Sequence, residues 1–315
     1  MSRIRRIRRK KPRTGSVWKK LLLWGVLGLL VLAAAAVAGS YLYVRAYLKS
    51  DGFLAMLEQS AVDDMNVETA RIDPLDWDGS GIRCGGVVME GHEFLTSLQA
   101  RNIETEFSRW ELLKRAFVIT SVNIAELKLH LAPVSFRFRE KPEGPRSWAE
   151  ENILPDTFRL EKGSIDSLSV SYGEAGRLYV LDGARVESAY DAGSSQYRFD
   201  VRGGKLLLPF QGCPEFSLMS GTAQFNHSSR RVNIPSCRLT TDAGGYLDIK
   251  GDWDGSSSSW TANVVVNGVP VSSILEDHWR KHVHGSVSGG IDLRGGRDGV
   301  THVAGLARLQ GGMLT

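Results

Sequence analysis

The alternation of apolar and polar residues changes phase in the middle of one long predicted strand. In residues 117–133, FVITSVNIAELKLHLAP, apolar residues occupy even positions in the first half and odd positions in the second. Each half alternates with a period of two, which predicts a strand with one apolar face. A bulge or break at Ala125–Glu126 would keep the apolar side chains on that same face. The residues predicted to line it are Val118, Val122, Ile124, Leu127, Leu129 and Leu131.

Similar alternating segments, separated by Gly-rich turns, continue to the end of the chain from residue 67. The chain holds 34 Gly, and Asp-Gly and Gly-Gly pairs recur between the segments. Such pairs supply the positive φ angles of tight hairpins. No helix of crossover length separates the segments, so we predict a mainly β protein with an extended, mostly antiparallel sheet. If its strands formed one unbroken, curved groove, roughly 18 to 20 of them would extend it over about 90 Å.

Two short amphipathic helices interrupt this pattern. Residues 45–66 form the first predicted helix, with Ser50 or Asp51 as its N-cap. Its apolar residues recur at helical spacing, and the helix either packs on the end of the domain or lies on a membrane surface. Residues 271–283 form the second predicted helix. The apolar residues of the first helix are Phe53, Leu54, Leu57, Ala61 and Met65.

A transmembrane helix is predicted near the N-terminus. The segment from Leu21 to Val44 has 24 residues and no charge, and about 20 apolar residues cross a hydrocarbon core. Ten basic residues precede it, which places the N-terminus in the cytoplasm and the body outside, as a single-pass protein. The predicted interfacial anchors are Trp18, Trp24, Tyr41 and Tyr43.

Two other interpretations of this N-terminal region stay open. The residues Ala36-Val37-Ala38 are typical of a signal-peptide cleavage site, although the apolar run is long for one. The basic tail is also typical of a nucleic-acid arm, but next to an apolar span it is more often a topology determinant. The remaining chain, 51–315, has 27 basic and 35 acidic groups. We therefore predict no nucleic-acid partner.

The predicted organisation follows these segments. A basic cytoplasmic tail (1–17) precedes the transmembrane helix (18–44) and the amphipathic helix (45–66). A first β region (67–139) is separated by a Pro-containing charged linker (140–157) from a second β region (158–315).

No motif predicts catalysis, a metal site or a cofactor. The chain lacks HExxH, GxSxG and phosphate-binding loops, so we predict that it is not an enzyme. His278 and His282 have a spacing that suits a metal, yet solvated histidines on a surface helix explain them better. Cys213 and Cys237 either form a disulfide or, with the remaining cysteine, stay as partly buried thiols.

Several segments together resemble the AsmA-like family of bacterial envelope proteins, a group that includes TamB-related proteins. The segment LKSDGFLAMLEQ is similar to the family's first periplasmic helix, and 117–133 is similar to its recurrent paired strands. VNGVPVSSIL, VHGSVSGGIDLRGG and VAGLARLQGGML are similar to its C-terminal part. The extended sheet between the two ends is short for the larger family members.

The resemblance implies an inner-membrane protein with a periplasmic β-groove that binds phospholipid acyl chains and contributes to phospholipid transport and outer-membrane homeostasis. The alternative is an anchored periplasmic scaffold for outer-membrane assembly that carries no lipid. Alternation alone does not separate a groove from a closed β-sandwich. A groove of this length implies that the chain hands lipid to a partner, shuttles it locally, or is part of a longer polypeptide.

Overall fold

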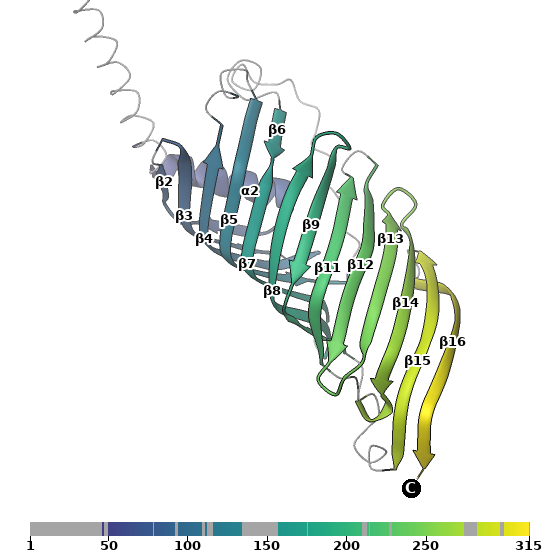
Figure 1. Cartoon of the computed structure of the whole chain (residues 1–315). Coiled ribbons are helices and arrows are strands. Elements are labelled where there is room, and N and C mark those ends of the chain that lie inside the picture. The colour runs from purple at the N-terminus through teal and green to yellow at the C-terminus, as the bar shows by residue number, and fades with distance from the viewer. Residues whose placement is uncertain are drawn as a thin grey trace, which may run out of the picture.

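In a computed structural model, the protein is one large sheet with a helix at its N-terminal end (Figure 1). The structure describes residues 50–133, 157–273, 282–296 and 299–314, apart from short gaps inside the first two ranges, together with Ala46. The elements in chain order are α2 (Asp51–Met65), β1 (Thr69–Ile72), β2 (Leu75–Trp77), β3 (Gly81–Glu90), β4 (Leu95–Phe107), β5 (Ala116–Leu131), β6 (Thr157–Leu160), β7 (Lys162–Glu174), β8 (Arg177–Asp191), β9 (Gln196–Arg202), β10 (Lys205–Leu207), β11 (Phe216–Asn226), β12 (Arg231–Thr241), β13 (Tyr246–Asp254), β14 (Ser259–Pro270), the 3-10 turn η1 (Val271–Ser273), β15 (Val283–Gly296) and β16 (Gly299–Leu314).

The helix α2 begins and ends with ordinary capping residues. Ser50 is the N-cap, and its hydroxyl accepts a hydrogen bond from the Phe53 N–H at 3.3 Å. Asn66 ends the helix in the left-handed conformation. The carboxylate of Glu58 accepts a hydrogen bond from the backbone N–H of Ile72 at 2.9 Å. This contact joins α2 to β1, at the first edge of the sheet.

The mainly β, mostly antiparallel prediction is confirmed: sixteen strands form one sheet. Its main path runs β1-β3-β4-β5-β7-β8-β10-β11-β12-β13-β14-β15-β16. Only β5 pairs in parallel among the described strands, with β6 and then with β7. Thr157 of β6 therefore lies beside Ala116, at the end where β5 begins. Strands on both sides of the predicted linker 140–157 thus belong to one sheet.

The phase change predicted in β5 is present and continues into the neighbouring strands. Ala125 is left out of the pairing with both β4 and β7, while the residues on either side of it stay paired. Asn102 of β4 and Asp166 of β7 are left out at the same level, and Asn102 has a left-handed φ of 50°. Such irregularities bend a strand.

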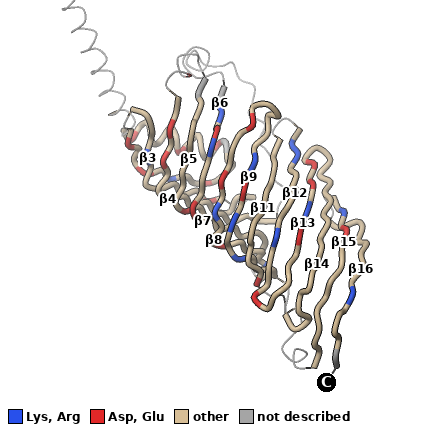
Figure 2. Tube along the Cα trace, in the orientation of Figure 1, with Lys and Arg blue, Asp and Glu red and all other residues tan. Residues whose placement is uncertain are grey.

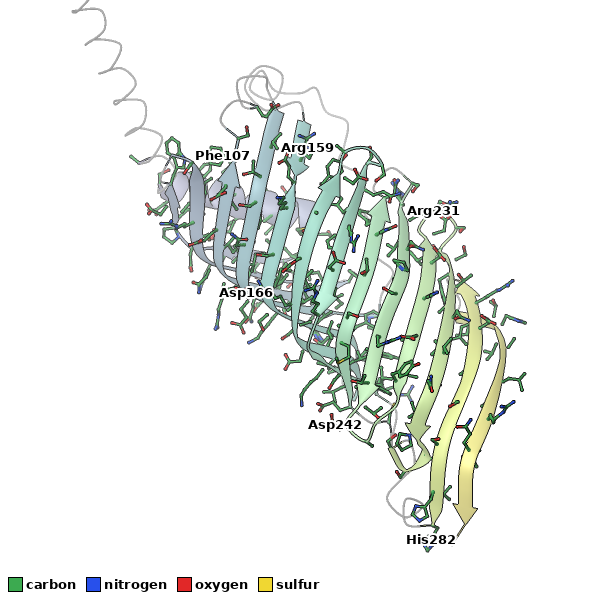
Figure 3. All side chains as sticks on the ribbon, in the orientation of Figure 1. Phe107, Arg159, Asp166, Arg231, Asp242 and His282 are labelled. Carbon is green, nitrogen blue, oxygen red and sulfur yellow. The ribbon has the colours of Figure 1, made fainter. Side chains whose placement is uncertain are left out.

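These aligned irregularities fold the sheet. In Figure 1 the lower parts of β3 to β8 turn away from the viewer, and Figure 3 shows Asp166 on the outside of this bend. Because each strand changes phase at the same level, the apolar side chains stay on one side of the bend. We call this side the inner face, and the charged side the outer face.

One cluster of buried side chains lies near one end of strands β11 and β12. Phe216, Leu218 and Leu239 are 3–6% exposed and form one cluster. Leu208 and Cys213, from the connection between β10 and β11, pack against it. No large side chain in the described part of the chain is less than 2% exposed, which fits a sheet without a second layer over its full length.

A tight connection between β9 and β10 depends on two glycines with positive φ. Gly203 has φ 67° with free space around it, whereas a Cβ on Gly204 (φ 89°) would lie 2.9 Å from the backbone of Asp182 and Ala184. We expect Gly204→Ala to destabilise the protein by about 2 kcal/mol, from backbone strain and this clash. Gly203→Ala, which adds backbone strain without a clash, should lower the free energy of unfolding by about 1 kcal/mol. Urea unfolding of both variants measures the difference, and equal costs would contradict the clash.

The N-terminal predictions fall outside the described residues. These are the basic tail, the apolar span 21–44 and the four aromatic anchors. In the part that the structure describes, no helix is both long and apolar enough to span a membrane. Of the second predicted helix, 271–283, the described beginning is the turn η1.

Candidate functional site: an apolar ladder along the inner face

A row of small and apolar residues crosses twelve strands of the inner face, one residue from each strand. Every member is the direct cross-strand partner of the next, so the row is continuous in register. At about 4.8 Å per strand, its eleven steps span roughly 50 Å. We call this row the central ladder. It comprises Cys84, Ile103, Ile124, Ile165, Val186, Val201, Gly221, Cys237, Ile249, Val264, Ile291 and Gly305.

The ladder is shorter than the groove length expected from the sequence. The described sheet has sixteen strands rather than 18 to 20, and the longest strands, β5 and β16, each have 16 residues. In addition, β6 and β7 both pair with β5, and β9 and β10 both lie between β8 and β11. The chain is therefore used to make long strands rather than many strands.

The ladder is only partly covered by the rest of the protein. Nine of its twelve members are half-buried, Gly305 is exposed, and only Cys84 and Val186 are buried. In a closed β-sandwich, the inner side chains of two sheets interdigitate. Here the described strands all belong to one sheet. The inner face thus presents a contiguous apolar surface of the kind that in soluble proteins marks a binding site.

The six residues predicted from the sequence lie together in the pairing of β5. Ile124 is itself a ladder member, and Val122 precedes it on the same face. Leu127 and Leu129 pair with Leu168 and Val170 beyond the bend. Val118 is 4% exposed and so serves the core. Leu131, the last of the six, pairs with Leu95 and Tyr172.

Polar residues of the same strand occupy the outer face, as alternation requires. Lys128 forms an ion pair with Glu126 at 2.6 Å, and Glu126 also meets Arg101 of β4 at 3.3 Å. His130 lies 2.6 Å from the Ser171 hydroxyl. Figure 2 shows charged residues of both signs spread along the strands rather than gathered in one patch. The outer face is thus held by local pairs and has no strong field of one sign.

The outer-face ion pairs shift the pKa values of their members. Arg238 binds Asp248 through two hydrogen bonds of 2.7 Å, which hold the pKa of this carboxyl below its usual range. Arg198 and Asp200 form a similar bidentate pair, and the Asp200 pKa is lowered for the same reason. The four side chains are between 32% and 60% exposed to solvent. We therefore assign the cross-strand pair Arg238–Asp248 to register, and both pairs to solubility rather than to chemistry.

Sequence reasoning missed a second row of inner-face residues, near the hairpin ends. They are direct cross-strand partners in succession, and Tyr190 and Tyr197 lie with ring centroids 4.9 Å apart. Trp253 is 43% exposed. Trp260 lies so close to Gly295 that a Cβ there would meet its ring at 2.4 Å. We call this the aromatic row: Tyr190, Tyr197, Phe225, Val232, Trp253 and Trp260.

A signal for this row does exist in the sequence. Each aromatic residue stands one or two positions from a predicted turn, in phase with the apolar residues of its strand. The register that aligns these positions across five strands depends on turn lengths and bulges, which the alternation within one strand does not reveal.

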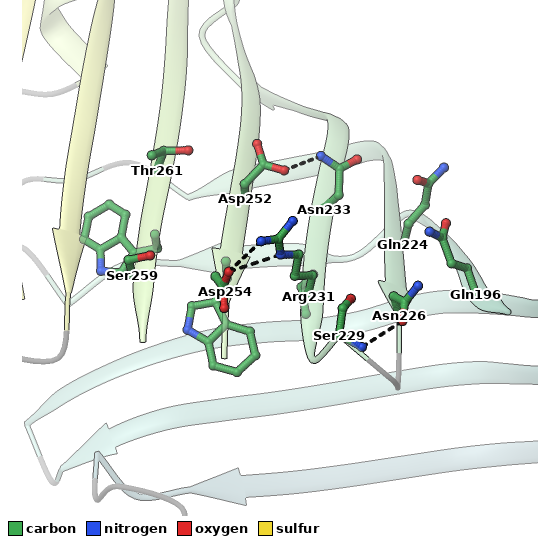
Figure 4. A pocket seen from close by; sticks show the side chains of 13 residues that line it. Gln196, Gln224, Asn226, Ser229, Arg231, Asn233, Asp252, Asp254, Ser259 and Thr261 are labelled. Atoms are coloured by element: carbon green, nitrogen blue, oxygen red, sulfur yellow. Dashed lines mark hydrogen bonds and ion pairs between the residues drawn. The ribbon is translucent and has the colours of Figure 1, made fainter. Parts of the chain in front are cut away.

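A polar hollow of about 530 Å³ opens near the ends of β11 to β14 (Figure 4). Its polar groups largely satisfy one another: Asn233 donates to Asp252 at 2.6 Å, and Arg231 donates to Asp254 at 3.1 Å. No nucleophile is paired with a base among these residues, so the hollow resembles a hydrated turn region more than a reaction site.

The carboxylate of Asp254 organises the turn beside this hollow. The Ser256 hydroxyl and the N–H groups of Ser256 and Ser257 donate to it, and they lower its pKa to about 2. A lowered folded pKa stabilises the protein above the ordinary pKa of 3.8, and this contribution disappears as the pH falls through about 2. We expect Asp254→Ala to lower the urea midpoint at pH 6 but not at pH 1.5. An equal loss at both pH values would contradict this.

The structure bears on the cysteine and histidine hypotheses. All three cysteines are free thiols, so the Cys213–Cys237 disulfide is not formed, and burial raises the pKa of both thiols. Within the described residues, no group of His, Cys, Asp and Glu is arranged to hold a metal ion. His282 and His284 are described, whereas His278 lies outside.

Comparison with protein families, with characterised proteins and with solved structures finds no match to this chain. The resemblance to the AsmA-like family thus stays a prediction based on the segments quoted above.

Proposed function

We propose that the protein is a membrane-anchored periplasmic lipid-binding and lipid-transfer protein of the AsmA-like type, and that the central ladder holds phospholipid acyl chains. The observation that carries this proposal is the continuity of the ladder, because each apolar residue is in register with the next across twelve strands. The partial exposure of nine members supports a surface that is available to a guest molecule.

The physical requirement for such a carrier is a continuous apolar track. Burial of a CH₂ group contributes about 0.8 kcal/mol, so one tail of about 16 carbons in water would cost on the order of 12 kcal/mol. Separate pockets would leave most of that cost in place between them. The ladder offers an apolar contact at about every 4.8 Å, which is close to the length of four methylene groups.

The length of the ladder limits what the chain can do by itself. Roughly 50 Å accommodates about two extended acyl chains end to end. Passage of lipid between two membranes would therefore use further strands or a partner. We propose local loading of lipid from the anchoring membrane, followed by transfer to such a partner.

Photo-crosslinking in membranes tests this function in the full chain. A benzophenone amino acid at Ile124 or Ile249 should form adducts with phospholipid, detected by mass spectrometry of the purified protein. The matched controls are Asn123 and Lys250, which neighbour these two positions on the outer face. Both controls are more exposed than the ladder residues, so simple accessibility predicts the opposite result.

A different outcome would favour the scaffold alternative. Equal lipid adducts on both faces, or protein adducts at the ladder positions without lipid, would show that the inner face does not hold acyl chains. Lipid adducts at least tenfold more abundant at the ladder positions than at the controls would support transfer.

A further inference from the structure

The two edges of the sheet differ in how they are protected. At the first edge, β1 has four residues, and Glu58 of α2 accepts the hydrogen bond of the Ile72 N–H. At the other edge, β16 extends over 16 residues and, in the described part of the chain, pairs only with β15. Proteins usually shield such an edge with Pro, Lys, bulges or short strands, because its free backbone groups recruit another strand.

The β16 edge has bulges near its two ends, at Thr301 and beside Gly311, but few of the other protective features. Its sequence, GVTHVAGLARLQGGML, holds no Pro, Lys, Asp or Glu, and Arg308 is its one residue with a permanent charge. Every residue from 299 to 312 is exposed. Four of them are large and apolar: Val300 at 56%, Val303 at 64%, Leu306 at 83% and Leu309 at 55%.

The residues of β16 are arranged nearly symmetrically about Leu306. On the inner face, Gly305 and Ala307 are equidistant from it, as are Val303 and Leu309. An antiparallel strand centred there would thus set small residues opposite small residues and branched apolar residues opposite each other. On the outer face, Arg308 would lie opposite the partner's Ala304, so no like charges would meet.

We propose that β16 pairs with β16 of a second copy of this chain, antiparallel and centred on Leu306. In this register inner-face residues oppose inner-face residues, since positions that sum to an even number lie on the same side. The two Leu306 side chains, which are the most exposed large apolar groups in the described chain, cover each other. The inner faces of the two copies then form one surface, in which Gly305 of each ladder lies opposite the partner's Ala307, and the two N-terminal ends lie at opposite ends. This proposal does not depend on lipid binding.

Cysteine crosslinking of the full chain in its membrane tests the register. Directly opposed residues have Cβ atoms about 4.5–5.5 Å apart, so Leu306→Cys should give a disulfide-linked dimer. The matched control is Arg308→Cys on the same face. Its partner would be offset by four residues, roughly 13 Å along the strand, which is beyond disulfide reach. The wild-type chain measures the background from its three native thiols.

We expect the crosslinked fraction to be at least tenfold higher for Leu306→Cys than for Arg308→Cys. Coexpressed Ala304→Cys and Arg308→Cys chains with different tags should form a mixed dimer. Equal crosslinking at both positions would indicate random collision and overturn the proposed register. Monomers in nanodiscs by mass photometry, with crosslinking at the background level, would overturn the dimer.

Discussion

Replacing Ile124 by Asp is expected to reduce lipid occupancy further along the ladder by at least tenfold. Ile124 is the third member of the ladder from the N-terminal end, between Ile103 and Ile165. A carboxylate at this point would have to lose its hydration against methylene groups, at a cost of several kcal/mol. Each 1.4 kcal/mol corresponds to a factor of ten in occupancy. Under the proposed function, lipid that enters from the N-terminal end must pass this point.

A benzophenone at Ile249, six strands further along the ladder, provides the measurement. Phospholipid adducts at this position should fall in the Ile124→Asp chain and stay unchanged with Asn123→Asp, which adds the same charge on the outer face. The variant Ile124→Leu keeps apolar volume and should retain the adducts. If Ile124→Asp leaves the Ile249 adducts intact in a folded protein, lipid does not travel along the ladder from the N-terminal end.

The local pattern of β5 was enough to predict its inner face, including the irregularity at Ala125. The apolar residues on both sides of Ala125 could share a face only if one position dropped out of the alternation, and that position is unpaired with both neighbours. Asn102 has the left-handed φ that Asn tolerates best after Gly. That these irregularities align across neighbouring strands depends on tertiary pairing, which no single segment contains.

Other features of the fold could not be derived from single strands. A sandwich and a single sheet give the same alternation, because one apolar face per strand satisfies both. The parallel pairing of β5 and β7 depends on the path of 132–156, whose composition indicates only an irregular connection. The sequence separation of Cys213 and Cys237 allowed a disulfide between them. In the structure both are free thiols that serve as small apolar groups beside the Leu239 cluster.

Replacing Leu239 by Ala is expected to give a large and local loss of stability. Leu239 is 3% exposed and packs between Leu218 of β11 and Leu247 of β13. Leu→Ala in a core costs about 2–5 kcal/mol, depending on how far the site collapses. The surrounding side chains are only partly buried and can relax, so we expect about 2–3 kcal/mol.

The loss should be local, because each strand in a single sheet contacts mainly its neighbours, as in repeat proteins. Hydrogen exchange should therefore accelerate in β11, β12 and β13 and change little in β3 and β4, at the far end. The matched control is Leu207→Ala in β10, where the side chain is 43% exposed and truncation should cost no more than about 0.5 kcal/mol. Uniform acceleration across the sheet would instead mean that it unfolds as one cooperative unit. In that case the cluster around Leu239 would stabilise the whole ladder, including the end at which lipid is proposed to enter.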